Sequence, residues 1–216
     1  MLRAVVFDMD GTLVDSEAFG AQLDNMFLER FGHQIDEEFA ERLVGANGKK
    51  AFEMIKEHFQ MSHALESLIE DYRKFTLVKW KAVPDLRLNQ GIPELIARLQ
   101  ASNLPLALAT SAHKDRLDIF LERLQLKQAF HAVVCGDDVA HSKPAPDIYL
   151  RAAEMIHVDP RDCVAIEDSK AGALSAKVAG MKVVGYKIAT NKQDLSIADR
   201  IIDHFDDLTI EALHSL

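Results

Sequence analysis

The sequence alternates short apolar runs with amphipathic helical patterns, and this alternation restricts the possible folds more than any other feature. The apolar runs cover residues 2–7, 104–109, 132–135, 163–166, 183–186 and 200–202. The helical patterns between several of them cover residues 92–99, 114–124, 147–156 and 171–179. Strands that are apolar throughout are typical of parallel sheets buried on both faces. The pattern therefore predicts an α/β fold with a Rossmann-like, doubly wound parallel sheet.

Residues 16–80 interrupt this alternation, because they form one helical pattern after another. Phe19, Leu23 and Phe27 recur at helical spacing, and similar apolar patterns continue through this stretch. Pro84 marks the expected return to the alternating pattern. We therefore expect an α/β core domain and an inserted helical domain. The core would comprise residues 1–14 and 84–216, and the helical cap residues 15–83.

Composition and charge limit the expected partners. The 25 Lys and Arg residues face 34 Asp and Glu residues, which gives a formal net charge of −9. No nucleic acid partner is expected, because its phosphates would be repelled. No membrane contact is expected either, since no apolar run approaches the roughly 18 residues of a membrane span and the first residues lack a signal-peptide pattern. Cys135 and Cys163 lie in apolar runs. Buried free thiols favour a reducing compartment, so we expect a cytoplasmic protein, with a monomer as the default state.

Polar residues follow the predicted strands at the points where these strands end. They are Asp8 and Asp10, Thr110 and Ser111, Lys143, and Glu167 and Asp168. Ligands of open parallel sheets bind at this edge. Carboxylates from two strands, such as Asp8 and Asp168, suit Mg²⁺, which prefers oxygen ligands. Asp8 could then act as a nucleophile, and Asp10 could protonate the leaving oxygen and later deprotonate a water molecule.

Structural explanations exist for each of these residues taken singly. An isolated Asp after a buried strand is more often a turn or helix cap than a catalyst. Lys143 could be a solvated loop cation, and Thr110 could cap the helix that begins near residue 114. Charge compensation by Lys143 and phosphate binding by Thr110 fit the same pattern. Four such segments in order at strand ends favour the chemical explanation.

These residues resemble the four motifs of the haloacid dehalogenase-like hydrolases, in the branch with a helical cap between motifs one and two. The matching segments are residues 7–16, 108–111, 142–147 and 166–169, the last followed by Ala171 and Gly172. The resemblance covers essentially the whole chain. Asp10 argues against the dehalogenase branch itself, which lacks a second aspartate in motif one.

The resemblance implies a role for each matched residue and Mg²⁺ as the cofactor. Asp8 would be nucleophile and metal ligand, Asp10 acid/base and a metal ligand through its backbone carbonyl, Lys143 a catalytic phosphate binder and Asp168 a metal ligand. Thr12, Thr110 and Ser111 would bind phosphate. Glu167 would bind the metal directly or through water.

The resemblance further implies a phosphatase that acts on a small phosphorylated metabolite, with a sugar phosphate as the first choice. Two alternatives stay open: an isomerase similar to the β-phosphoglucomutases, and a regulatory relative without catalysis. Those mutases carry a histidine at the position that aligns with Gly20, which favours hydrolysis here. Lys49 and Lys50, after the glycine-containing segment 45–48, are candidates for substrate contact; the alternative is a solvated helix start.

Overall fold

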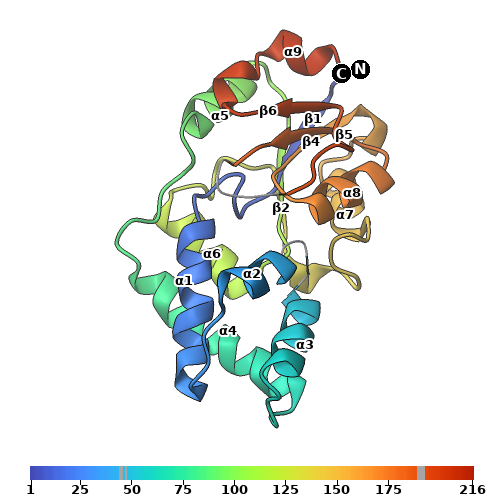
Figure 1. Ribbon diagram of the computed structural model, residues 1–216. Coiled ribbons are helices and arrows are strands. Elements are labelled where there is room, and N and C mark those ends of the chain that lie inside the picture. The colour runs from blue at the N-terminus through green and yellow to red at the C-terminus, as the bar shows by residue number, and fades with distance from the viewer. Residues whose placement is uncertain (44–45, 47, 189–192) are drawn as a thin grey trace. The chain divides into compact units, whose positions relative to one another are not determined.

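The computed structural model describes residues 1–43, 46, 48–188 and 193–216. Its centre is a six-stranded parallel sheet with the strand order β3-β2-β1-β4-β5-β6 (Figure 1). The strands are β1 (Ala4–Phe7), β2 (Leu106–Ala109), β3 (Ala132–Val134), β4 (Cys163–Glu167), β5 (Lys182–Tyr186) and β6 (Arg200–Ile202). Each of the six predicted apolar runs matches one of these strands to within two residues at either end, so the predicted fold class is confirmed.

Helices pack on both faces of the sheet. The helices of this part of the chain are α5 (Ile92–Ala101), α6 (Lys114–Arg123), α7 (Asp147–Met155), α8 (Lys170–Val178) and α9 (Ile210–His214). Helix α7 packs on β1 to β3 and α8 on β4 and β5, while α5 lies on the opposite side of the sheet (Figure 1). Small residues such as Ala107 and Ala165 face α7 and α8, which lets these helices approach the sheet closely.

The order of the strands places the site. The chain moves from β1 outward to β2 and β3, and then returns to the other side of β1 with β4. Such a reversal opens a crevice at the carboxyl ends of the central strands. Phe7, the last residue of β1, is opposite Leu108 of β2 and Ile166 of β4. The residues that follow these three strands therefore meet at one edge of the sheet.

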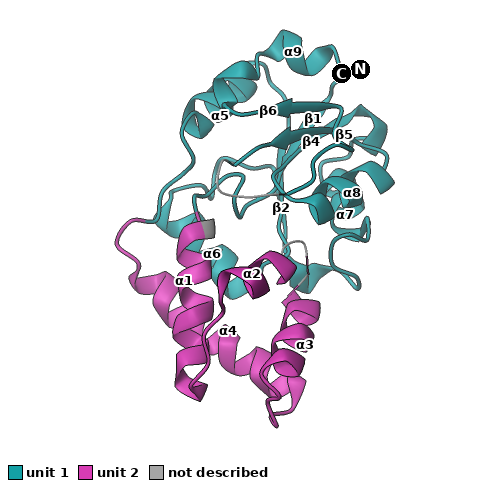
Figure 2. Ribbon diagram, viewed as in Figure 1, with its two compact units in different colours: residues 1–15, 86–216 teal, residues 16–85 magenta. Residues whose placement is uncertain are grey.

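The remaining helices belong to a separate compact unit, residues 16–85, and the sheet unit comprises residues 1–15 and 86–216 (Figure 2). The expected boundaries after residues 14 and 83 differ from these by one and two residues. The helices are α1 (Glu17–Leu28), α2 (Glu37–Leu43), α3 (Gly48–His58) and α4 (Leu65–Ala82). Short 3-10 turns complete the chain: η1 (Glu29–Phe31), η2 (Gly136–Asp138), η3 (Pro160–Asp162) and η4 (Phe205–Asp207).

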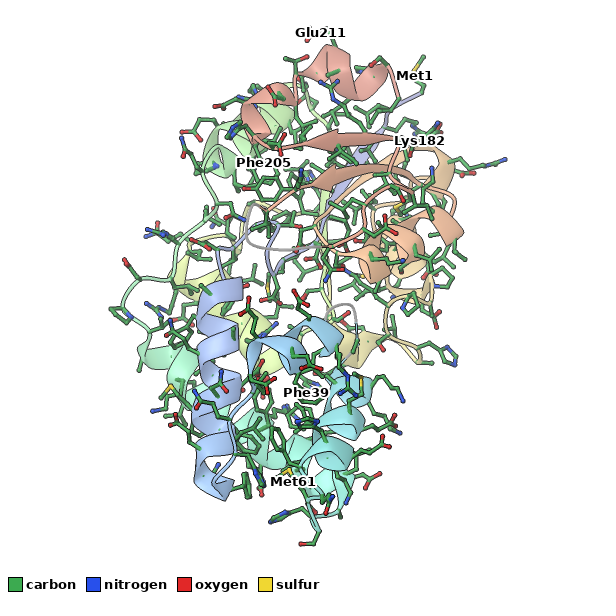
Figure 3. The ribbon with its side chains drawn as sticks, in the orientation of Figure 1. Met1, Phe39, Met61, Lys182, Phe205 and Glu211 are labelled. Carbon is green, nitrogen blue, oxygen red and sulfur yellow. The ribbon has the colours of Figure 1, made fainter. Side chains whose placement is uncertain are left out.

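The helical unit has its own apolar core. Phe27, Phe39, Ile55 and Met61 are buried in it, and Phe39 and Met61 are labelled in Figure 3. The ring of Tyr72 packs edge-on against Phe27 at a centroid distance of 5.2 Å. Burial of this aromatic cluster explains why apolar residues recur at helical spacing in this unit. Of the segment 45–48, residues 45 and 47 lie outside the described residues.

The two chain segments that connect the units are tied to the sheet unit. Val14 pairs with Leu88 in an antiparallel bridge, and the Asp15 amide donates to the Arg87 carbonyl at 3.2 Å. The Arg87 guanidinium also donates to the Asp15 carboxylate at 3.1 Å. Val14 is fully buried, so this end of the connecting segment is part of the sheet unit. Among the described residues, no helix is long and apolar enough to cross a membrane.

Candidate active site

Asp8 is the first residue beyond β1 and lies at the centre of the crevice. Its side chain is almost completely buried, and its amide donates to the Ile166 carbonyl at 3.0 Å. One carboxylate oxygen accepts a hydrogen bond from the Lys143 ammonium at 2.5 Å. The carboxylate is therefore held in one orientation by a charge-assisted bond.

Lys143 reaches this position from the loop after β3, where it precedes Pro144 in a cis peptide bond. Its ammonium donates to Asp8, to the Glu167 carboxylate at 2.6 Å and to the Ala109 carbonyl at 3.1 Å. Burial alone would lower the pKa of Lys143, but the two carboxylates outweigh burial and raise it above its ordinary value. Lys143 is therefore a buried, charged ammonium and not a solvated loop cation.

Asp8 titrates far from its ordinary range. Burial, with the charges of Glu167 and Asp10, raises the pKa of Asp8 to about 7 against the lowering effect of Lys143. One ammonium thus faces several carboxylates in a poorly solvated crevice. A site with this excess of negative charge suits an additional cation.

The acidic cluster fits such a cation. Asp8, Glu167 and Asp168 each offer an oxygen atom within 4.8 Å of the others. Carboxylate oxygens are the ligands that Mg²⁺, Ca²⁺ and Mn²⁺ prefer. The donor set therefore matches the expected Mg²⁺, although it does not distinguish Mg²⁺ from the other two ions.

Gly11 and Thr12 position Asp168 in this cluster. The Thr12 hydroxyl is fully buried and donates to the Asp168 carboxylate at 3.0 Å. Gly11 has a positive φ of 77°, and a Cβ atom there would lie 2.3 Å from the same carboxylate. The turn after β1 thus requires glycine at position 11 for two reasons: the positive φ, and the lack of space for a side chain. Thr12 was expected to bind phosphate. In the structure its hydroxyl donates to Asp168, and phosphate binding by Thr12 stays a prediction.

Thr110 and Ser111 lie beyond the end of β2 in different environments. Thr110 is buried, and its hydroxyl accepts a hydrogen bond from the Ala112 amide at 3.1 Å, inside the loop before α6. It follows Ala109, whose carbonyl holds Lys143. Ser111 is exposed. The expected phosphate contacts of both residues stay predictions.

Three residues of this site had no role in the sequence prediction. Arg116, in the first turn of α6, forms an ion pair with the Asp10 carboxylate. The Asn89 amide donates to the carbonyls of Gly11 at 2.7 Å and Thr12 at 2.8 Å, which holds the turn after β1. Tyr149 donates its hydroxyl hydrogen bond to Glu167 at 2.7 Å. None of the three lies in the four segments that the sequence analysis matched, so that analysis did not find them.

Lys49 and Lys50 lie at the start of α3 in the helical unit. Both are exposed, and the Lys50 ammonium donates to the Glu53 carboxylate at 3.2 Å. An i,i+3 pair of this kind is ordinary on an exposed helix. Substrate contact by either lysine stays a prediction.

The strand order and the buried cluster of acids and lysine define a Rossmann-like α/β protein with a site suited to a cation. The family model described as haloacid dehalogenase-like hydrolase matches residues 5–186. The chain therefore belongs to the haloacid dehalogenase-like hydrolases. The predicted family is confirmed.

Individual relatives span nearly the same length. The β-phosphoglucomutase of Bacillus subtilis is 32% identical over 99% of this chain and 94% of its own. A phosphorylated carbohydrates phosphatase of Thermotoga maritima is 32% identical over 84% of this chain and 83% of its own. A crystal structure of a CbbY variant from Rhodobacter sphaeroides, in complex with xylulose-(1,5)bisphosphate, superposes with a TM-score of 0.86. It shares 26% identity and covers 99% of both chains.

Proposed function

We propose that this protein is a Mg²⁺-dependent phosphatase that hydrolyses a small phosphate monoester through an aspartyl-phosphate on Asp8. The observation that carries this proposal is the carboxylate of Asp8 itself. It stands at a strand end, bonded to a buried ammonium and within reach of two further carboxylates. Sugar phosphates are the first substrates to test, since the Thermotoga relative is named for phosphorylated carbohydrates.

Each residue has a definite part in this proposal. Asp8 attacks the phosphorus atom, and Asp10 donates a proton to the leaving oxygen and later takes one from water. Lys143 offsets the charge that Asp8 and the phosphoryl group bring together, and Thr110 and Ser111 bind phosphate oxygens. A phosphate contact of the Thr12 hydroxyl would have to replace its bond to Asp168. Two side chains, Asp8 and Asp168, and the Asp10 carbonyl would hold Mg²⁺, which supplies charge neutralisation at the phosphoryl group.

A mutase is the second candidate, because the Bacillus relative carries that name. Gly20 favours hydrolysis over phosphoryl transfer to a sugar. It lies on α1 and presents no side chain at the position where the mutases carry a histidine. A mutase must protect its phospho-aspartate from water, whereas a phosphatase must admit water.

The helical unit, residues 16–85, is proposed to act as the cap that selects the substrate, with Lys49 and Lys50 as contact residues. A cytoplasmic location and a monomeric state belong to the same proposal. The two free, buried cysteines, Cys135 and Cys163, fit a reducing compartment.

A phosphate-release assay on a panel of phosphorylated metabolites tests this function. We expect release with Mg²⁺ present, loss of release in excess chelator, and recovery when Mg²⁺ is restored. Sugar phosphates, nucleotides and glycerol phosphates should be included. Absence of release from every member, with the protein folded and Mg²⁺ in excess, would reject the phosphatase.

A further inference from the structure

Tyr149 lies directly beneath the active-site network. It is the third residue of α7 and is completely buried against the sheet. Its hydroxyl donates to Oε1 of Glu167 at 2.7 Å, and the Lys143 ammonium lies 5.0 Å from the centre of its ring. Tyr149 thus contacts Glu167 and Lys143, and it is not itself one of the catalytic candidates.

The Glu167 carboxylate is occupied on both oxygens. Oε1 accepts from Lys143 at 2.6 Å and from Tyr149, and Oε2 accepts from the Ser169 amide at 3.2 Å and hydroxyl at 3.0 Å. An ionised carboxylate has about four lone-pair sites, so this one is saturated. Gly172 closes the remaining space, since a Cβ atom there would lie 1.7 Å from Oε1.

The Lys143 ammonium is saturated in the same way. Its three donors go to Asp8, Glu167 and the Ala109 carbonyl. Because the ammonium has no spare donor, its position depends on where Glu167 stands. The chain of contacts therefore runs from Tyr149 through Glu167 and Lys143 to the proposed nucleophile.

Direct binding of a metal ion by Glu167 would break at least one of these four bonds at a fully buried carboxylate. A buried donor left without its acceptor carries a large desolvation penalty. Asp8 and Asp168 need no such exchange with Tyr149. The three carboxylates are close enough to share an ion, but their hydrogen bonds divide them into two roles.

We propose that Tyr149 is a positioning residue: through Glu167 it fixes Lys143 against Asp8, and it holds Glu167 outside the inner coordination sphere of the metal. The inference rests on the proposed function. It assigns Glu167, a candidate metal ligand on the sequence, to the support of Lys143. Tyr149 acts on the chemical step and not on metal binding.

The test is Tyr149→Phe, which removes the hydroxyl without changing charge and keeps the ring under Lys143. The kcat for phosphate release should fall about tenfold, in the range typical of lost outer-shell contacts. The dissociation constant for Mn²⁺ alone, followed by electron paramagnetic resonance, should stay within about twofold because the inner ligands are unchanged. The KM should also stay within about twofold.

A double-mutant cycle with Glu167→Gln shows whether Tyr149 acts through Glu167. In the Glu167→Gln background, Tyr149→Phe should lower kcat less than about twofold further. The matched control is Tyr72→Phe, which removes another tyrosine hydrogen bond to a carboxylate, that of Asp24, from the helical unit. This control should lower the Tm while kcat and Mn²⁺ affinity stay unchanged.

Two results would overturn the inference. A Mn²⁺ affinity that weakens about tenfold or more in Tyr149→Phe would make Glu167 an inner ligand that Tyr149 orients. An unchanged kcat in a folded Tyr149→Phe protein would remove the positioning role. If the unmodified protein released no phosphate from any substrate, the proposed function would fail, and the Mn²⁺ comparison would still decide the role of Glu167.

Discussion

Asp8 combines deep burial with a raised pKa and a fixed orientation, which is the environment of a reactive group and not of a surface carboxylate. This environment could not be predicted from the residues next to Asp8 in the sequence. The bond to Lys143 joins residues 135 positions apart. The tertiary structure thus gives each of them a partner that its own segment does not contain.

Asp8→Asn should reduce phosphate release below about 1% of the original kcat, since the amide is neither a nucleophile nor a good metal ligand. The fold should persist because the substitution is isosteric and adds no volume to the core. Circular dichroism and a single-turnover assay check both statements. Asp118→Asn, at an exposed carboxylate of α6 paired with Lys114, is the matched control and should retain full kcat. Retention of more than a few per cent of kcat in Asp8→Asn would contradict the aspartyl-phosphate.

The first turn of α8 shows how one element serves both the fold and the site. Ser169 caps the helix by accepting from the Gly172 amide at 3.0 Å, and the same hydroxyl donates to Glu167. Capping of this kind stabilises a helix by about 1 kcal/mol. The Glu-Asp-Ser sequence at the end of β4 therefore ends the strand, starts the helix and holds the carboxylates.

Gly172→Ala should displace the Glu167 carboxylate, because the new Cβ atom would lie 1.7 Å from Oε1. We expect a loss of about 1–3 kcal/mol in the free energy of unfolding from overpacking. The kcat should fall about tenfold or more with the disturbance of Lys143. Urea unfolding and steady-state kinetics measure the two effects. Gly20→Ala, where a Cβ atom meets nothing within 4 Å, should instead stabilise α1 by about 0.5–1 kcal/mol.

The helical unit contains a pH-sensitive contact of its own. Burial raises the pKa of Asp24 above its ordinary value of 3.8, and the hydrogen bond from Tyr72 only partly offsets this rise. Below the ordinary value both the folded and the unfolded carboxyl carry a proton. As the pH rises, the unfolded state releases its proton near the ordinary pKa and the folded state only at its higher pKa. The contribution of Asp24 to stability is therefore lost as the pH rises through the folded pKa.

Asp24→Asn should remove this part of the pH dependence. The unfolding free energy of the variant, relative to the original protein, should increase as the pH rises above about 4. Urea unfolding followed by the fluorescence of Trp80, the one tryptophan and part of the same unit, measures the difference. A constant difference across this range would show that Asp24 titrates normally.

At the scale of the whole molecule, the two units divide the work that the proposal requires. The sheet unit carries every residue of the acidic cluster, and the helical unit carries Lys49 and Lys50. Lys49→Ala and Lys50→Ala should therefore change KM or the ranking of substrates, with Mn²⁺ affinity unchanged within about twofold. Unaltered kinetics across the panel for both variants and for the double variant would exclude these lysines from substrate binding.

The choice between hydrolase and mutase is also a property of the whole molecule. The protein is incubated with β-glucose 1-phosphate, Mg²⁺ and a catalytic amount of the 1,6-bisphosphate. We expect inorganic phosphate to form faster than glucose 6-phosphate, on the proposal that Gly20 of α1 aligns with the mutase histidine. Faster formation of glucose 6-phosphate would favour the mutase.

The sequence by itself determined the sheet, the insertion and the residues at the strand ends. Each of these leaves a local signal, because a buried strand must be apolar throughout and must stop where polar residues begin. Helix α9 was not predicted, since its five residues are too few to show a helical period.

Only the tertiary structure decided which polar groups meet. Arg116 and Asp10 are 106 positions apart, and Tyr149 reaches Glu167 from another helix. An arginine in a helix, or a tyrosine on its buried face, has the same local pattern whether or not it contacts a catalytic residue. The folded sheet brings these side chains to one edge, and burial there strengthens their hydrogen bonds and charge interactions because the local dielectric constant is low. For that physical reason the sequence located Asp8, the proposed nucleophile, whereas the structure identified the side chains that surround it.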